Sequence, residues 1–197
     1  WATVGAAIYW VLGQGYNYVL ALKLDATAVA SVNAARLLLM PTYLLTMGVK
    51  SLLLPMCVRW LDEGGFDFVL RQIGKFVLAI ALLDLIYFAV LMATHEWLVA
   101  KVLRKTLADQ GFMLSMWFLL SLINLVRDLY LSALLARERF RDTAGLVALT
   151  AALTLLTMWP AIDRLGMSGA LVGLAVGETV FLLGALRLIA RERRRLP

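Results

Sequence analysis

The chain has 197 residues, of which 62% are hydrophobic and 16% are charged, and its formal net charge is +6. Its mean hydropathy is +0.85, and soluble domains are only about 45–50% apolar, so the composition excludes an ordinary soluble domain and favours an α-helical membrane protein. The single cysteine, Cys57, excludes an internal disulfide and a cysteine-based metal site, and the single histidine, His95, excludes a two-histidine metal motif. We therefore expect no metal centre and no cofactor.

Six apolar segments are long enough to cross a bilayer, which takes about 20 residues of helix. In chain order they cover residues 1–22, 26–55, 76–94, 111–136, 143–159 and 166–190. Runs of this length without strand alternation indicate helices. We predict an all-α membrane protein with one six-helix transmembrane unit over residues 1–197.

The first two segments contain residues that weaken helices. The uncharged first segment has the stretch GQGYNY (13–18) near its middle, and the second contains Pro41 and Pro55. Such residues either free backbone groups that line a cavity or produce ordinary kinks that neighbouring helices repair.

Arg36 is the only charged residue between positions 26 and 49. A continuous helix here would place it near the bilayer centre, where burial costs at least about 2.5–3.5 kcal/mol. Asn33 lies one turn earlier on the same face. We expect Asn33 and Arg36 to line a polar cavity. The alternative is that Arg36 extends to the membrane surface.

Two links are longer than the others, RWLDEGGFDFVLRQIGK (59–75) and HEWLVAKVLRKTLADQ (95–110). Their mixture of aromatic, apolar and charged residues predicts amphipathic segments lying on the membrane surface. A role as a substrate gate is the alternative.

Three further ionisable residues fall within the apolar segments: Asp84 in the third, Arg127 in the fourth and Glu178 in the sixth. Asn124 precedes Arg127 by three residues, so both are candidates to line the cavity, although Arg127 is also close enough to an interface to snorkel. Asp84 and Glu178 either neutralise the two arginines or couple transport to an ion. The sequence does not decide between these roles.

The sixth segment carries Gly169, Gly173 and Gly177 at four-residue spacing. Small residues on one helix face allow another helix to approach closely, so we expect helix packing here.

Lysine and arginine are concentrated after the second and fourth segments and in the C-terminal tail. Because cytoplasmic loops of membrane proteins are enriched in these residues, we predict that these parts and the start of the first segment are cytoplasmic. The tail sequence RERRR (191–195) suits contact with anionic membrane lipids. Topology thus explains the positive charge without a nucleic-acid partner.

The stretch LDATAVASVNAARLLLMPTYLL (24–45) resembles the seventh-to-eighth helix passage of polysaccharide and O-antigen flippases in the multidrug/oligosaccharidyl-lipid/polysaccharide exporter superfamily. The segment Asn33–Arg36 and Pro41 fit that pattern, and Val32 stands where the family usually has an aromatic residue. LGMSGALVGLAVGE (165–178) and ARERFRDTAGL (136–146) are similar to the late glycine-rich helix and the basic internal link of the family.

The resemblance implies the C-terminal half, one lobe of a twelve- to fourteen-helix exporter in the bacterial inner membrane. The chain starts at Trp1 with no methionine, and we therefore expect the N-terminal lobe to be missing. The family exports by alternating access, and the implied substrate is a lipid that carries an oligosaccharide through a pyrophosphate, used in surface polysaccharide (lipopolysaccharide) biosynthesis. Arg36 and Arg127 would offset phosphate charge, and Asn33 and Asn124 would bind sugar hydroxyls.

Other functions stay open. An ion-coupled multidrug or metabolite exporter would share the fold but should expose acids rather than arginines in its cavity. A membrane enzyme acting on lipid carriers would need paired carboxylates or a histidine, and the only candidate, His95 beside Glu96, would point apart on a helix. A helical scaffold would use the glycine face alone. We expect a transporter and not an enzyme.

Overall fold

The computed structural model describes residues 2–98 and 110–194. This part of the chain is helical and contains no strand. Its helices are α1 (Ala2–Lys23), α2 (Ala26–Leu38), α3 (Met40–Leu98), α4 (Gln110–Ala136), α5 (Phe140–Leu165) and α6 (Met167–Arg194). The all-α prediction is therefore confirmed.

Four helices in the described residues are long and apolar enough to cross a membrane. These candidate spans are Met40–Thr94, Gly111–Ala136, Phe140–Leu165 and Met167–Arg194. Helix α2 has 13 residues and is too short to cross a bilayer by itself. The apolar helices support the predicted class of membrane protein, but the element boundaries differ from the six predicted segments.

The predicted second segment, 26–55, is not one helix. Helix α2 ends at Leu38, and the N–H of Leu39 bonds to the carbonyl oxygens of Arg36 and Leu37. Pro41 explains the break, because its ring cannot continue a helix that arrives from Leu37, whereas the first turn of a new helix accepts proline. Arg36 consequently lies in the last turn of a short helix, next to the junction between α2 and α3, and not in the middle of a long helix.

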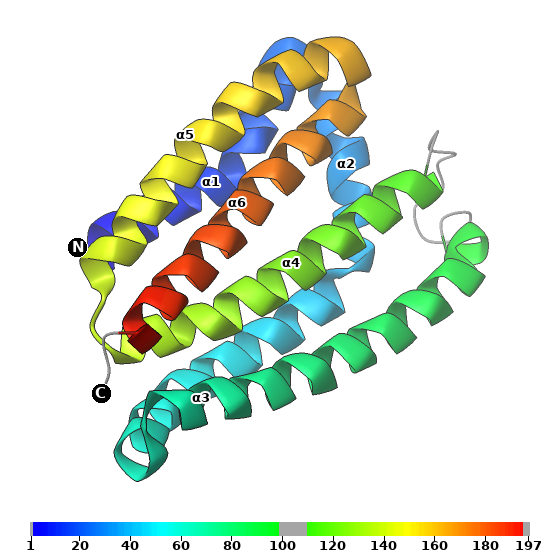
Figure 1. Ribbon diagram of the computed structural model, residues 1–197. Coiled ribbons are helices and arrows are strands. Elements are labelled where there is room, and N and C mark those ends of the chain that lie inside the picture. Colours follow the sequence, from blue (N-terminus) through cyan, green and yellow to red (C-terminus); the bar gives the residue numbers. More distant parts are fainter. Residues whose placement is uncertain (1, 99–109, 195–197) are drawn as a thin grey trace.

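Helix α3 has 59 residues and folds back on itself at Gly65 (φ 73°, ψ −174°), a conformation that favours glycine. Figure 1 shows the two arms, 40–64 and 66–98, as a helical hairpin along one side of the molecule. The segment 59–75, predicted to lie on the membrane surface, forms this corner together with the adjoining turns of both arms, and its place relative to a membrane stays a prediction. The other predicted surface segment, 95–110, lies almost entirely outside the described residues.

Helix α5 continues through Pro160 to Leu165, although the sequence predicted its end at Trp159. Proline removes one backbone hydrogen bond, but the residues beyond it still have apolar surface to bury, and Ile162 is only 3% exposed in the core. The helix ends instead at Gly166, where φ is 59°. Packing of the final turn thus outweighs the local effect of proline.

Helix α6 packs on α5 through its glycine face. A Cβ atom built on Gly173 would lie 2.6 Å from the Cα of Met158, and atoms built on Gly169 and Gly177 would also overlap α5. The spacing of these glycines indicated this kind of packing. In Figure 1, α1 lies beside α5, α6 lies between α5 and α4, and α4 separates α6 from the α3 hairpin.

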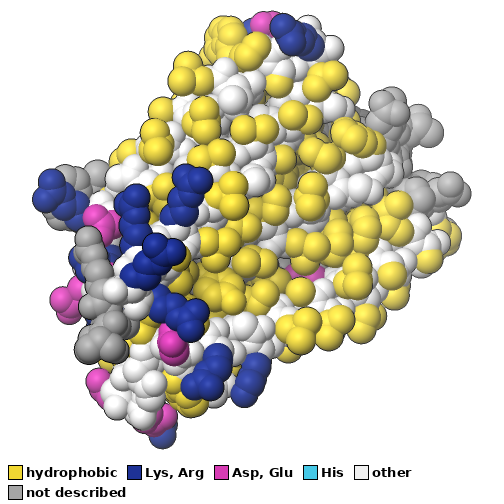
Figure 2. All heavy atoms as spheres, in the orientation of Figure 1, with side chains coloured by type: hydrophobic (Ala, Val, Ile, Leu, Met, Phe, Trp, Pro, Cys, Tyr) yellow, Lys and Arg dark blue, Asp and Glu magenta, His cyan; other side chains and the backbone are white. Residues whose placement is uncertain are grey.

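One end of the molecule gathers four parts of the chain. Figure 1 shows there the start of α1, the Gly65 corner, the link between α4 and α5, and the end of α6. Figure 2 shows that Lys and Arg side chains crowd this same end, while hydrophobic side chains cover the face of the bundle in view. Such segregation of basic residues from apolar helix faces is typical of membrane proteins.

Candidate functional site

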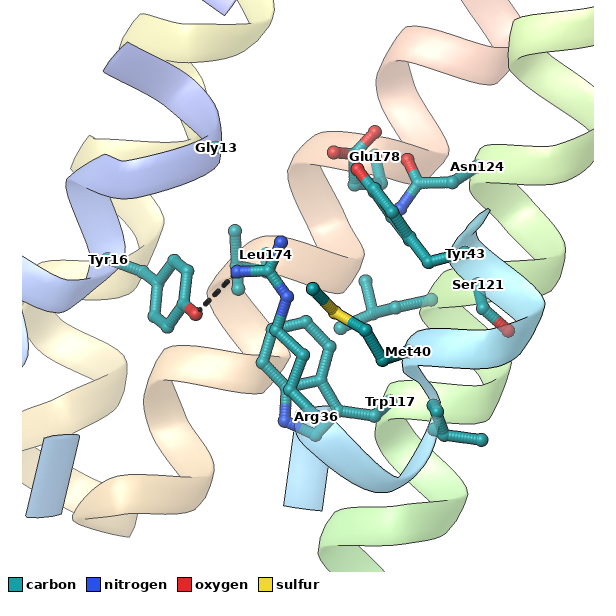
Figure 3. Close-up of a pocket in the computed structure, with 12 residues that line it drawn as sticks. Gly13, Tyr16, Arg36, Met40, Tyr43, Trp117, Ser121, Asn124, Leu174 and Glu178 are labelled. Carbon is teal, nitrogen blue, oxygen red and sulfur yellow. Dashed lines mark hydrogen bonds between the residues drawn. The ribbon is translucent and has the colours of Figure 1, made fainter. Parts of the chain in front are cut away.

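Arg36 extends from the last turn of α2 towards α1 and α4 and is half-buried. Its NH1 donates a hydrogen bond to the hydroxyl of Tyr16 over 3.0 Å, drawn in Figure 3. The guanidinium carbon lies 5.5 Å from the ring centre of Trp117 and 5.6 Å from that of Tyr43. Cation–π contacts of this kind stabilise a desolvated guanidinium without removing its charge.

No carboxylate within the described ranges forms an ion pair with Arg36. Its hydrogen bond and ring contacts are with uncharged groups, so no side chain in the described part of the chain forms an ion pair that compensates its positive charge. A guanidinium has five N–H donors in a planar fork, and the bond to Tyr16 uses only one of them. The residue is therefore equipped to bind an anion.

A chain of hydrogen bonds orients Tyr16 for this contact. The Tyr16 hydroxyl donates to Oδ1 of Asn33 over 2.6 Å, so one of its lone pairs is free to accept from Arg36. Nδ2 of Asn33 donates in turn to Oδ1 of Asn17 (2.7 Å) and to the carbonyl oxygen of Val29 (2.9 Å). Asn33 thus holds Tyr16 in place, and it does not line the cavities beside Arg36.

Trp117 is held equally firmly. Its indole Nε1 donates to the carbonyl oxygen of Val32 over 3.0 Å, and its ring meets Tyr16 edge-on at 5.7 Å. The bond to Val32 links α4 to the helix that carries Arg36. Neither Tyr16, Trp117 nor Tyr43 was predicted as a site residue, because no spacing in the sequence connects α1, α4 and α3.

Two adjoining cavities lie beside Arg36. The smaller has a volume of about 70 Å³, and the larger has about 730 Å³, within the usual range of about 300–1,000 Å³ for ligand sites. The two share five lining residues: Gly13, Arg36, Tyr43, Ser121 and Asn124. The larger cavity mixes apolar walls with the polar side chains of Gln14, Thr46, Lys50, Ser51, Asp128 and Ser132.

Asn124 lines both cavities, as the sequence analysis predicted. Its Oδ1 is buried and has no hydrogen-bond partner within residues 2–98 and 110–194. Figure 3 shows its amide beside Glu178 and the hydroxyl end of Tyr43. An amide so placed can accept a hydrogen bond from a ligand hydroxyl.

Arg127 has a different position from the one predicted. Its side chain is fully buried and lines neither of these cavities. Its Nε and NH2 donate to Oδ1 of Asp128 over 2.9 and 2.8 Å, and its NH1 donates to Oε2 of Glu178. The guanidinium carbon also lies 4.7 Å from the ring centre of Phe181. Two carboxylates therefore surround Arg127, and a direct cavity role does not fit this geometry.

The two intramembrane acids also differ from each other. Glu178 pairs with Arg127, which is the charge-pairing alternative, and it also lines the smaller cavity. Asp84 is only 1% exposed, and its Oδ2 has no hydrogen-bond partner in the described part of the chain. Asp84 forms no ion pair with Arg36 or Arg127.

Comparison with known proteins yields no significant match: no family model, no curated protein and no solved structure matches the chain. Among the described residues, no group of three His, Cys, Asp or Glu side chains could hold a metal ion. The chemistry of the Arg36 site is therefore the main guide to function.

Proposed function

We propose that this chain is part of a membrane transporter that moves a lipid-linked anionic saccharide, and that the cavity beside Arg36 receives the phosphate groups of that substrate. The observation that carries the proposal is Arg36 itself: a half-buried, uncompensated guanidinium at the wall of a cavity within a bundle of apolar helices. A cation so placed is costly unless it serves a polar pathway or a ligand.

The chemistry around Arg36 suits a phosphate better than a simple anion. The planar guanidinium can donate two hydrogen bonds to one phosphate. Asn124 and Ser121, which line the same cavity from α4, can bond to sugar hydroxyls. Pyrophosphate-linked oligosaccharides combine these two kinds of group, and this agrees with the flippase resemblance of residues 24–45.

The proposal includes a topology of six crossings with both termini in the cytoplasm. The crossings would be α1, then α2 continued by the first arm of α3, the second arm of α3, and α4, α5 and α6. Support comes from the shared end of the bundle, where the Lys and Arg side chains gather. In this arrangement the chain forms the C-terminal lobe of an alternating-access exporter in the bacterial inner membrane, and an N-terminal lobe would close the cavity.

An exporter of cations is less compatible with the site. Such a protein should present unpaired carboxylates to its cavity, yet Glu178 is bonded to Arg127, and Asp128 is bonded to Arg127 and Lys50. The net charge that the walls offer to a ligand is therefore positive.

The test uses the complete protein in cells that assemble a surface polysaccharide on a lipid carrier. Arg36→Ala should strongly reduce surface polymer while membrane insertion, measured by immunoblot of the membrane fraction, stays normal. Arg36→Lys should restore transport only in part, because an ammonium cannot make the two-pronged contact. Arg164→Ala, which removes an exposed cation that lines neither cavity, is the matched control. Normal polymer in the Arg36→Ala strain would refute the proposal.

A further inference from the structure

Glu178 and Arg36 line the same cavity of about 70 Å³ and yet do not pair. Figure 3 shows the two side chains reaching into this cavity from α6 and α2, with Asn124 and Tyr43 beside Glu178. Opposite charges in such a small, mostly apolar space attract strongly, because little water screens them. In the structure another group binds the carboxylate instead.

Arg127 is the group that does so. It lies on α4, lines neither cavity and donates from NH1 to Oε2 of Glu178. Asp128 fixes the other edge of its guanidinium with two bonds. Lys50 donates to the remaining oxygen of Asp128 over 3.1 Å. Lys50, Asp128, Arg127 and Glu178 together are formally neutral, so Arg36 alone sets the sign of the site.

We propose that Arg127 is a positioning residue that determines the charge selectivity of the Arg36 site by retaining Glu178. This inference rests on the proposed function and assigns to Arg127 a role at a distance. With Arg127 in place, the cavity presents one uncompensated cation and selects anions. Without it, Glu178 turns towards Arg36, forms the missing ion pair and competes with the phosphate of the ligand.

The experiment measures binding of inorganic pyrophosphate to the complete, detergent-solubilised protein by isothermal titration calorimetry. Arg127→Gln should weaken binding by about tenfold or more, equivalent to about 1.4 kcal/mol. Glu178→Gln should bind at least as tightly as the wild type, because the competing carboxylate is gone. The double variant Arg127→Gln/Glu178→Gln should return to within about twofold of the wild type, and Arg127→Lys should stay close to it.

A purely structural role for Arg127 predicts the opposite result for the Glu178 variants. In that case Glu178→Gln and the double variant would lose binding as much as Arg127→Gln, since each breaks the same buried pair. That outcome overturns the inference. Glu178→Gln keeps the test decisive even if Arg127→Gln does not fold, because weaker pyrophosphate binding by a folded Glu178→Gln protein also overturns it.

The control separates failure of this inference from failure of the proposed function. If Arg36→Ala abolishes pyrophosphate binding and Arg127→Gln binds like the wild type, only the role of Arg127 is refuted. If the wild type does not bind pyrophosphate, or Arg36→Ala binds it equally well, both proposals fall.

Discussion

The contact between α5 and α6 gives a sharp prediction for Gly173→Ala. In an exposed helical position the change from glycine to alanine favours the helix by about 0.8–1.0 kcal/mol. At Gly173 the new methyl group would lie 2.6 Å from the Cα and 2.7 Å from the Cβ of Met158, and backbone cannot move aside as a flexible side chain can. Overpacking of this kind costs about 1–3 kcal/mol, so we expect net destabilisation.

The matched control is Gly145→Ala, on an exposed face of α5, where nothing lies within 4 Å of the new methyl group. Thermal unfolding of the two proteins in the same detergent should therefore shift in opposite directions, downwards for Gly173→Ala and upwards or not at all for Gly145→Ala. Because Leu174 and Glu178 follow Gly173 on α6 and line the cavity, pyrophosphate binding should weaken as well. A Gly173→Ala protein as stable as the Gly145→Ala protein would show that the contact between α5 and α6 accommodates the added methyl group without loss of stability.

Three further changes test other parts of the structure. Tyr16→Phe leaves Oδ1 of Asn33 without its hydrogen-bond donor and should lower the unfolding free energy, measured by chemical denaturation, by about 1–3 kcal/mol. It should also weaken pyrophosphate binding, because Arg36 loses its contact with the hydroxyl. An unchanged affinity would show that Tyr16 does not contribute to the site. In Gly65→Ala the new methyl group has no atom within 4 Å, but alanine must adopt a φ of 73°. The unfolding free energy should therefore fall by about 1–3 kcal/mol from backbone strain alone. A melting temperature equal to that of the wild type would contradict this. Glu192→Gln removes the carboxylate that accepts hydrogen bonds from Arg137 and Arg139 on the α4–α5 link. The loss of stability should shrink as salt is added, and a salt-independent loss would indicate a packing effect instead.

The sequence by itself determined the class of protein and most of its helices. Long apolar runs specify helices because lipid leaves backbone groups no other partner, and the bounds of α4 and α6 lie close to the predicted segments. The glycine repeat marked the face that meets α5, since close approach depends on small residues and leaves a local pattern. Arg36 and Asn124 were also predicted as cavity-lining residues, because polar residues in apolar segments are costly unless they face a cavity or a polar partner.

The local sequence pattern did not predict the ends of helices correctly where two physical effects compete. The break at Leu39 and the continuation of α5 past Pro160 both involve a proline near a helix end, yet one helix stops and the other does not. Whether proline ends a helix depends on how much apolar surface the next turn can bury, and that surface belongs to other helices.

The tertiary structure alone decided which charges meet. Arg127 and Glu178 are 51 residues apart and form a pair, whereas Arg36 meets Tyr16 and Trp117 from two other helices. A residue pattern records which face of a helix is polar but not which polar face lies opposite, because that depends on the packing of the whole bundle. Two arginines that looked equivalent in the sequence therefore differ in the structure: one is neutralised within the protein, and the other keeps its charge beside a cavity.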